Sequence, residues 1–186
     1  SQFSLLTHSC TAALEMAAIL CDLKSGDEVI MPSYTFVSTA NAVVLRGAIP
    51  VFVDVDKLTL NMDYREVRKA ITSKTKAVFA VHYAGFIADM DFIVEICKDN
   101  NIYLVEDAAQ ALGSYFKNKL AGSFGDMAAF SFHETKNIIS GEGGALTINN
   151  SSLYERAQII RQKGTNKNQF LNGHADKYTW VDIGSS

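Results

Sequence analysis

The chain is poor in the residues that mark several common classes of protein. Its three cysteines, Cys10, Cys21 and Cys97, lie far apart and form no Cys-x-x-Cys pair, so neither a disulfide framework nor a zinc site is indicated. There are only two prolines, Pro32 and Pro50, and no linker or internal repeat divides the chain. We therefore expect a single domain with reduced thiols.

The sequence also lacks a strong charge and a long apolar run. Its formal net charge is −3, which gives no electrostatic reason to expect a nucleic acid or an anionic membrane as a partner. No window approaches the roughly 20 apolar residues of a membrane-spanning helix. The chain has 186 residues, 48% of them hydrophobic and 20% charged, which is typical of a domain with a substantial core. We expect it to be cytoplasmic.

Short apolar runs alternate along the chain with segments that carry an apolar residue every three or four positions. The short runs predict strands at 28–31, 49–53, 77–81, 103–106, 128–132 and 145–148. The periodic segments predict helices at 11–21, 35–46, 64–71, 90–100 and 151–163. This alternation predicts an α/β fold with a mostly parallel sheet.

Two candidate catalytic residues follow predicted strands. Asp107 comes after the strand that ends at 106, and Lys136 lies in the loop after the strand that begins at 128. Ligands of open α/β sheets bind at the carboxyl ends of the strands. The aldehyde of pyridoxal phosphate needs an amine partner, and its ring nitrogen is an electron sink only while an acid keeps it protonated. The pair therefore predicts an enzyme that uses pyridoxal phosphate.

Each residue of the pair has a plainer interpretation. An aspartate such as Asp107 is about as often the N-cap of a helix that follows its strand. A loop lysine such as Lys136 is usually a solvated charge. The catalytic interpretation is favoured because both residues map to one rim of one sheet.

Ser9-Cys10-Thr11-Ala12 stands where the first predicted helix begins. Hydroxyl groups and free N–H groups at the positive end of a helix dipole form a natural phosphate site. Capping by Ser9 or Thr11 explains the same residues equally well. The loop lacks the glycine patterns of dinucleotide and P-loop sites, which disfavours NAD and ATP.

Four further segments have more than one interpretation. Phe36 is placed to cover the face of a flat cofactor, although a phenylalanine that opens a helix is more often part of the core. His82 and Tyr83 follow the strand at 77–81, where either ring can line a pocket, and a structural histidine is favoured for His82. His133-Glu134 lacks the second histidine of a metal-binding helix, so no metal site is expected. The polar loop at 163–170 has the length to reach a substrate or another subunit, and a solvated loop is its default interpretation.

Three motifs carry a resemblance to a known family: PSYTFVSTAN at 32–41, SFHETKN at 131–137 and DKYTW at 176–180. They resemble those of the DegT/DnrJ/EryC1/StrS sugar aminotransferases, and the resemblance covers essentially the whole chain. It implies a three-layer α/β/α large domain of a type I pyridoxal-phosphate-dependent transferase over residues 1–186. An N-terminal segment and a small C-terminal domain would lie outside this stretch, and the protein would be a homodimer with shared active sites.

The resemblance also implies a role for each site residue. Lys136 would bond to the cofactor aldehyde and then carry a proton between the substrate and the cofactor. Asp107 would pair with the pyridine nitrogen, and Gln110 would contact the phenolic oxygen. The phosphate would be held by Thr11, Ala12 and Ser131, and the ring face would be covered by Phe36.

The substrates follow from the resemblance alone. L-glutamate would give its amino group to a dTDP-linked 4-keto-6-deoxyhexose, as the motif at 176–180 suggests. The alternatives are an aminotransferase for 3-keto sugars, a sugar dehydratase on the same scaffold, and a non-catalytic relative that binds sugar nucleotides. Dehydrating relatives typically carry histidine in place of the lysine, so Lys136 disfavours dehydration.

Overall fold

Seven strands form the central sheet of the computed structural model, which describes residues 1–185. Their order across the sheet is β1-β9-β8-β5-β4-β2-β3. Neighbouring strands are parallel except that β9 runs antiparallel to both β1 and β8. The strands are β1 (Phe3–Thr7), β2 (Glu28–Pro32), β3 (Ile49–Val53), β4 (Thr75–Val81), β5 (Tyr103–Asp107), β8 (Met127–Ser131) and β9 (Gly144–Ile148). The predicted α/β class with a mostly parallel sheet is confirmed.

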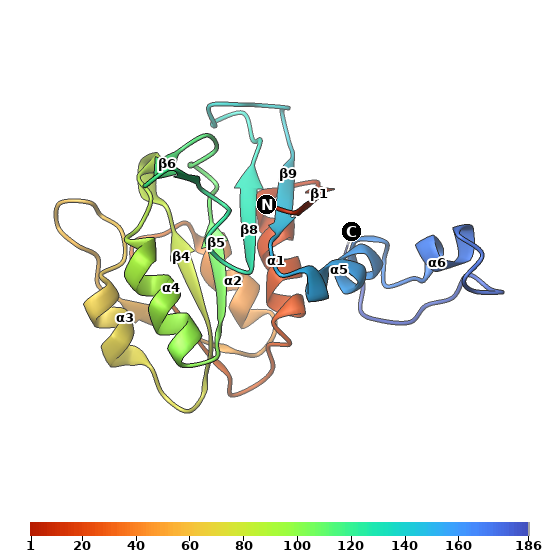
Figure 1. The fold of residues 1–186 in the computed structure, drawn as a ribbon, viewed down its shortest axis with the longest axis horizontal. Helices are drawn as coiled ribbons and strands as arrows, with labels where there is room; N and C mark the ends of the chain where they lie inside the picture. Colours follow the sequence, from red (N-terminus) through yellow and green to blue (C-terminus); the bar gives the residue numbers. More distant parts are fainter. Residues whose placement is uncertain (186) are drawn as a thin grey trace.

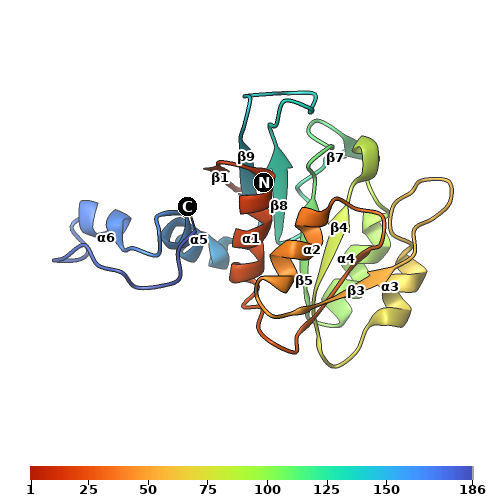
Figure 2. The ribbon, with the colours of Figure 1, turned by 180° about the vertical axis from the view of Figure 1, so that it is seen from behind.

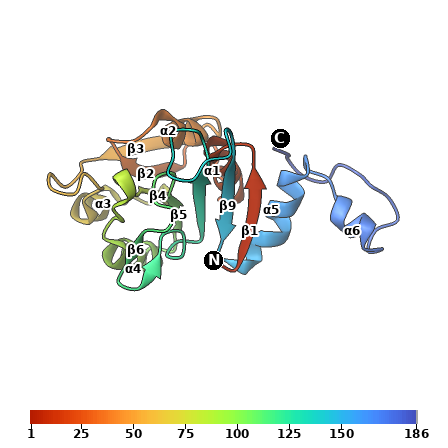
Figure 3. The ribbon, with the colours of Figure 1, turned by 90° about the horizontal axis from the view of Figure 1, so that it is seen from above.

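Helices cover both faces of this sheet, as the view from above shows (Figure 3). One face carries α1 (Cys10–Leu20) and α2 (Val37–Val44), and the other carries α3 (Tyr64–Ala70) and α4 (Met90–Asp99). The two largest apolar clusters lie on opposite faces of the sheet, and a smaller third one contains Phe130 and five alanines. The molecule is therefore built in three layers, with a single sheet between two sets of helices.

The edge beside β1 carries the last two helices. The short turn η2 (Ser151–Leu153) leads into α5 (Tyr154–Arg161), and α5 packs against α1 and β1. The last helix, α6 (Lys167–Leu171), lies farther from the sheet than any other element (Figure 1). In the described part of the chain, no helix is both long enough and apolar enough to cross a membrane.

Helix α1 is buried on nearly every side. It lies beside α2 over the strands (Figure 2), and its alanines Ala13, Ala17 and Ala18 are fully buried. Small side chains let the helix axis approach the sheet and its neighbouring helices closely. This packing holds the N-terminus of α1 at the same edge of the sheet as the carboxyl ends of the parallel strands.

Several local elements differ from those that the sequence predicts. Strand β1 was not predicted, because only Leu5 of its five residues is buried and its partner β9 lies more than 130 residues away. The hairpin β6 (Tyr115–Phe116) and β7 (Lys119–Leu120) and the turn η1 (Tyr83–Gly85) were also not predicted. The helix predicted at 35–46 begins only at Val37, since Phe36 is extended. The predicted solvated loop at 163–170 contains the start of α6.

Candidate active site

A cavity of about 620 Å³ lies at the carboxyl ends of β2, β4, β5 and β8. Its size is within the range typical of small-molecule sites. The N-terminus of α1, the start of α2 and the loop after β8 supply the rest of its wall. Of the predicted site residues, it is lined by Thr11, Phe36, Asp107, Gln110, Ser131 and Lys136. Residues from five separate parts of the chain thus meet in one cavity.

Asp107 is the last residue of β5, and its side chain is only 6% exposed. Its Oδ2 accepts a hydrogen bond of 2.7 Å from the Thr39 hydroxyl, and its Oδ1 accepts one of 3.2 Å from the Ala109 N–H. Burial raises the pKa of Asp107 above its ordinary value. Turns at 109–113 follow β5, so the interpretation of Asp107 as the N-cap of a following helix is wrong.

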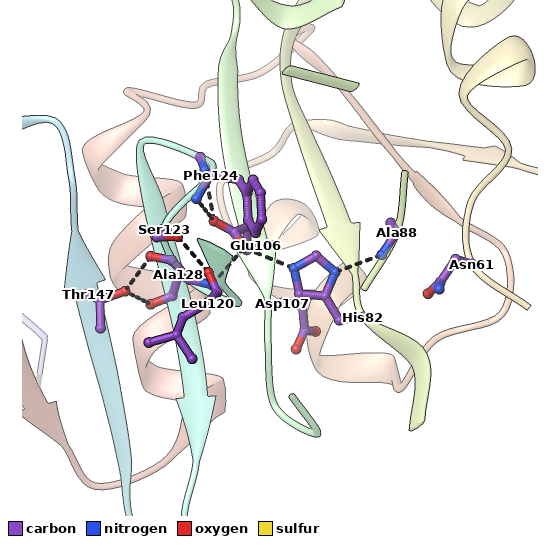
Figure 4. Close-up of polar contacts among 12 residues, drawn as sticks. Asn61, His82, Ala88, Glu106, Asp107, Leu120, Ser123, Phe124, Ala128 and Thr147 are labelled. Atoms are coloured by element: carbon purple, nitrogen blue, oxygen red, sulfur yellow. Dashed lines mark hydrogen bonds and ion pairs between the residues drawn. The ribbon is translucent and has the colours of Figure 1, made fainter. Parts of the chain in front are cut away.

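Glu106 precedes Asp107 and points to the opposite face of β5, as expected for successive residues of a strand. It is fully buried and accepts hydrogen bonds from His82 Nε2 at 2.9 Å and from the backbone N–H groups of Gly122, Phe124 and Gly125 (Figure 4). Burial acts to raise the pKa of Glu106, but the His82 and backbone hydrogen bonds outweigh it and hold that pKa below its ordinary value.

His82 is bonded through both ring nitrogens. Its Nδ1 accepts the Ala88 N–H at 3.3 Å, so in a neutral ring the proton lies on Nε2, which donates to Glu106. The residue is buried, and its hydrogen bonds connect the end of β4 to β5 and to the start of α4. This geometry agrees with the structural interpretation of His82 rather than with a role as a catalytic base.

Lys136 lies in the loop between β8 and β9, and its side chain is partly exposed. Its backbone N–H donates to the His133 carbonyl at 2.9 Å. The positive charge of Lys136 acts to lower the pKa of Asp107, although burial outweighs it, and both side chains line the cavity. The structure therefore brings the predicted pair to one cavity.

The start of α1 confirms the capping interpretation of its sequence and also lies at the cavity. Ser9 caps the helix, because its Oγ accepts the Ala12 N–H at 3.1 Å. Ser9, Cys10 and Thr11 line the cavity, whereas Ala12 is buried and does not. Within residues 1–185, the N–H groups of Cys10 and Thr11 have no hydrogen-bond acceptor. They are the free donors that a phosphate site at a helix N-terminus requires.

Gly144 shows how tightly the start of α1 is held. A Cβ atom at this position would lie 2.4 Å from the Ser9 carbonyl carbon and 2.5 Å from the Cys10 nitrogen. The first residue of β9 therefore passes directly against the first turn of α1, where only glycine fits. This contact fixes the helix N-terminus relative to the loop that carries Lys136.

Aromatic side chains form the remaining wall of the cavity. Phe36 is 75% exposed, so the alternative that it belongs to the core is wrong. The Tyr34 and Tyr83 hydroxyls are hydrogen-bonded at 2.8 Å, and their ring centroids are 4.7 Å apart. Beside them, Gln110 Oε1 accepts the Ala84 N–H at 2.8 Å. These contacts join the loops that follow β2, β4 and β5.

The whole chain is similar to known proteins. The model of the DegT/DnrJ/EryC1/StrS aminotransferase family matches residues 1–184. The chain belongs to this family. The predicted family, the predicted large-domain fold and the assignment to an enzyme family are confirmed. Pyridoxal phosphate is the cofactor of these aminotransferases, and the predicted cofactor is likewise confirmed.

Two curated members of the DegT/DnrJ/EryC1/StrS family show the level of similarity. GDP-perosamine synthase of Escherichia coli O157:H7 is 40% identical over 163 residues, which is 88% of this chain and 45% of that protein. The spore coat polysaccharide biosynthesis protein SpsC of Bacillus subtilis (strain 168) is 39% identical over 180 residues, which is 97% of this chain and 46% of that protein. The chain spans about half the length of these relatives.

Solved structures agree with this family. An aminotransferase from Psychrobacter cryohalolentis superposes with a TM-score of 0.93 at 35% identity, over 100% of this chain and 48% of that one. A putative sugar aminotransferase from Streptococcus pneumoniae, in its PLP form, superposes with a TM-score of 0.86 at 32% identity, over 98% of this chain and 50% of that one.

The geometry of the cavity fits the cofactor of the DegT/DnrJ/EryC1/StrS family. A buried acid lies at the end of β5, a lysine lines the same cavity, and hydroxyl and N–H donors lie at the start of α1. Within residues 1–185, no cluster of three metal-ligating side chains occurs. The sequence analysis did not identify three polar residues near the cavity, namely Thr35, which precedes α2, and Ser38 and Thr39, which lie in its first turn. Their clustering beside Phe36 was the available signal.

Proposed function

We propose that the protein to which this chain belongs is a pyridoxal-phosphate-dependent aminotransferase acting on a nucleotide-linked keto sugar. The observation that carries the proposal is that Lys136 and the buried Asp107 line one cavity. An amine and a buried acid are the two groups that this cofactor requires of a protein. Residues 1–186 would form the large domain, with an N-terminal segment and a small C-terminal domain supplied by the rest of the protein.

The side chains of the cavity divide the chemistry among them. Bound pyridoxal phosphate supplies an aldehyde for amine exchange and a ring that takes up an electron pair. Asp107 would keep the ring nitrogen protonated, and the positive ring would in turn offset the cost of burying its carboxylate. The Lys136 amine would remove and return the proton at the reacting carbon of the substrate.

The other predicted residues would bind and orient the cofactor. Thr11, Ser131 and the backbone at Ala12 would hold the phosphate at the start of α1, where the helix dipole favours negative charge. Phe36 would cover the ring face from the start of α2. Gln110 would contact the phenolic oxygen, because its amide NH₂ group remains free to donate while its Oε1 accepts the Ala84 N–H.

The proposed amino donor is L-glutamate, and the proposed acceptor is dTDP-4-dehydro-6-deoxy-D-glucose. The product would be dTDP-4-amino-4,6-dideoxygalactose, a precursor for cell-surface polysaccharide such as enterobacterial common antigen or O antigen. The resemblance of the motif at 176–180 supports this acceptor. A GDP-linked sugar is the second candidate, because a relative that is 40% identical is named as a GDP-perosamine synthase.

We also propose a homodimer with shared active sites and a cytoplasmic location. The family assignment supports the dimer. The three cysteines are free thiols in the described structure, which is typical of proteins in a reducing compartment.

The test uses the full-length protein. It is incubated with pyridoxal phosphate, L-glutamate and a panel of dTDP-linked and GDP-linked sugars that carry the ketone at carbon 3 or carbon 4. Mass spectrometry and NMR of the products identify the sugar that gains nitrogen and the carbon that carries it. An aminated dTDP-4-keto sugar is the expected result, and a dehydrated sugar without nitrogen would contradict the proposal.

Two variants make the test specific to the proposed amine. Lys136→Ala should abolish the near-visible absorbance of the lysine-bound cofactor and lower turnover by about 100-fold or more, because proton transfer loses its carrier. Lys136→Arg keeps the positive charge but cannot form the covalent link, so it should be equally inactive. Turnover at the wild-type rate in either variant would reject the assignment of Lys136.

A further inference from the structure

The carboxylate of Asp107 is held by a side chain 68 positions away in the sequence. Thr39, in the first turn of α2, donates its hydroxyl proton to Asp107 Oδ2 at 2.7 Å. Thr39 is 0% exposed and Asp107 is 6% exposed. Water therefore has little access to the Thr39 side of this hydrogen bond, and loss of the bond would leave a carboxylate oxygen with a partner missing on the protein side.

The direction of the next hydrogen bond follows from proton counting. A threonine hydroxyl has one proton, and that of Thr39 is used on Asp107. The hydroxyl of Thr35 lies 2.8 Å from the Thr39 hydroxyl, so Thr35 must donate and Thr39 must accept. The two bonds form a chain from Thr35 through Thr39 to Asp107, and aligned hydrogen bonds of this kind polarise one another.

This series of hydrogen bonds leaves the Asp107 carboxylate oriented and still able to bind a ligand. The Asp107 Oδ1 accepts the Ala109 N–H at 3.2 Å, so both oxygens are held from the protein side. Each carboxylate oxygen has two acceptor sites, and the remaining ones are free on the cavity side. A donor in the cavity, such as a protonated ring nitrogen, would meet a carboxylate that is already in place.

The first turn of α2 is also bonded to the phosphate side of the site. The Ser38 hydroxyl lies 2.8 Å from the Thr11 hydroxyl, and Phe36, the residue before the helix, lines the same cavity. One turn of helix thus contacts the predicted acid, the predicted phosphate ligand and the predicted ring cover. Its hydroxyl groups reach the two ends of the cavity from residues that are adjacent in sequence.

We propose that Thr39 is a positioning residue, which holds the Asp107 carboxylate ionised and oriented toward the ring nitrogen of the cofactor, with Thr35 as the outer donor. This role rests on the proposed function, because it concerns the same cavity. It predicts that the Thr39 hydroxyl matters for cofactor binding through Asp107 and not only for the stability of α2.

The test compares variants of the full-length protein by titrating the cofactor-free form with pyridoxal phosphate and measuring the dissociation constant from absorbance. Thr39→Val has nearly the same shape but no hydroxyl, and it should raise the dissociation constant about tenfold, as expected for a lost hydrogen bond to a charged group. Thr39→Ser keeps the hydroxyl and should restore binding to within about twofold of the wild type. Thermal denaturation of each variant gives its stability separately.

A double-mutant cycle separates positioning from a structural effect. In an Asp107→Asn background, Thr39→Val should change the dissociation constant by less than about twofold, because the carboxylate that it orients is gone. An equal loss in both backgrounds would overturn the proposal. So would a Thr39→Val protein that melts earlier but binds the cofactor like the wild type.

Three further outcomes of these measurements are distinguishable. If Thr39→Val does not fold, Thr35→Val removes only the outer donor and should raise the dissociation constant about threefold, and unchanged binding would overturn the proposal. A wild type that does not bind pyridoxal phosphate would overturn both the proposed function and the role of Thr39. A wild type that binds, together with unchanged Thr39 variants, would overturn the positioning role alone.

Discussion

At the scale of single residues, two adjacent carboxylates have opposite properties. Glu106 faces a set of four donors and has a lowered pKa, whereas Asp107 faces a cavity and has a raised pKa because burial outweighs its two hydrogen bonds. A satisfied carboxylate stabilises the fold. A buried carboxylate with free acceptor sites at a cavity is a candidate functional group, since a positively charged ligand would stabilise its ionised form.

Glu106→Gln should destabilise the protein by about 1–3 kcal/mol at pH 7, because an amide NH₂ group would face backbone N–H donors that need an acceptor. The pKa of Glu106 in the folded state is below its ordinary value, so its contribution to stability is present above that ordinary value and is lost as the pH falls through the lowered one. The variant should therefore lose less stability on acidification than the wild type.

Urea denaturation at pH 7 and at successively lower pH checks this prediction. The matched control is Glu134→Gln, which changes an exposed glutamate on the loop after β8. Equal midpoints for the two variants at pH 7 would show that the hydrogen bonds of Glu106 do not contribute.

At the scale of elements, the site depends on the approach of β9 to the start of α1. The antiparallel β9 is inserted between the parallel strands β8 and β1, and its first residue, Gly144, touches the turn that presents the free N–H groups. The contact between Gly144 and the first turn of α1 thus involves the cap of the helix, the end of a paired strand and the predicted phosphate site. A change in this contact should alter stability and cofactor binding together.

Gly144→Ala should destabilise the protein by about 1–3 kcal/mol, because its Cβ would overlap the backbone of Ser9 and Cys10 and the two elements would have to move apart. It should also weaken the binding of pyridoxal phosphate. The control is Gly141→Ala on the same loop, where a Cβ meets no atom and the cost is only that of a φ of +81°, about 1–2 kcal/mol. Thermal denaturation and cofactor titration measure both effects, and unaltered cofactor binding in Gly144→Ala would contradict the coupling.

At the scale of the whole molecule, the segment after α5 projects from the sheet (Figure 1). It is tied to the body at its base, where Arg156 pairs with Asp22 at 2.6 Å and with Asp182 at 2.8 Å. Its outer part exposes large apolar side chains, namely Phe170, Leu171, Tyr178, Trp180 and Val181. Apolar groups gathered on a projecting segment are typical of a protein interface.

Trp180, which is 76% exposed, should therefore contribute to the proposed homodimer. Trp180→Ser should raise the dimer dissociation constant about 30-fold, because buried tryptophans are frequent hot spots of interfaces. Asp176→Ser, a change of an exposed polar residue on the same segment, is the control. Sedimentation of the full-length variants measures the constants, and equal values for the two would contradict this prediction.

Much of the fold and part of the site could be predicted from sequence patterns. Five of the six predicted strands have apolar runs that are buried along most of their length, whereas β3 lies at the sheet edge with Ile49 and Phe52 exposed. The residues after β2, β4, β5 and β8 fall at one rim because these four strands are parallel. Residues that depend on distant partners could not be predicted. Thr39 became recognisable only through its hydrogen bond to Asp107, and β1 only through its pairing with β9.

The order of amino acids by itself determined the layered α/β class, the family and the positions of the amine and the acid, because apolar periodicity and short motifs are local properties. Only the tertiary structure decided that Glu106 is satisfied while Asp107 faces the cavity, and that Phe36 is exposed. It also showed that adjacent residues in the first turn of α2 form hydrogen bonds with Asp107 and with Thr11. The physical reason is that burial and hydrogen bonding depend on which segments meet, and these segments are far apart along the chain.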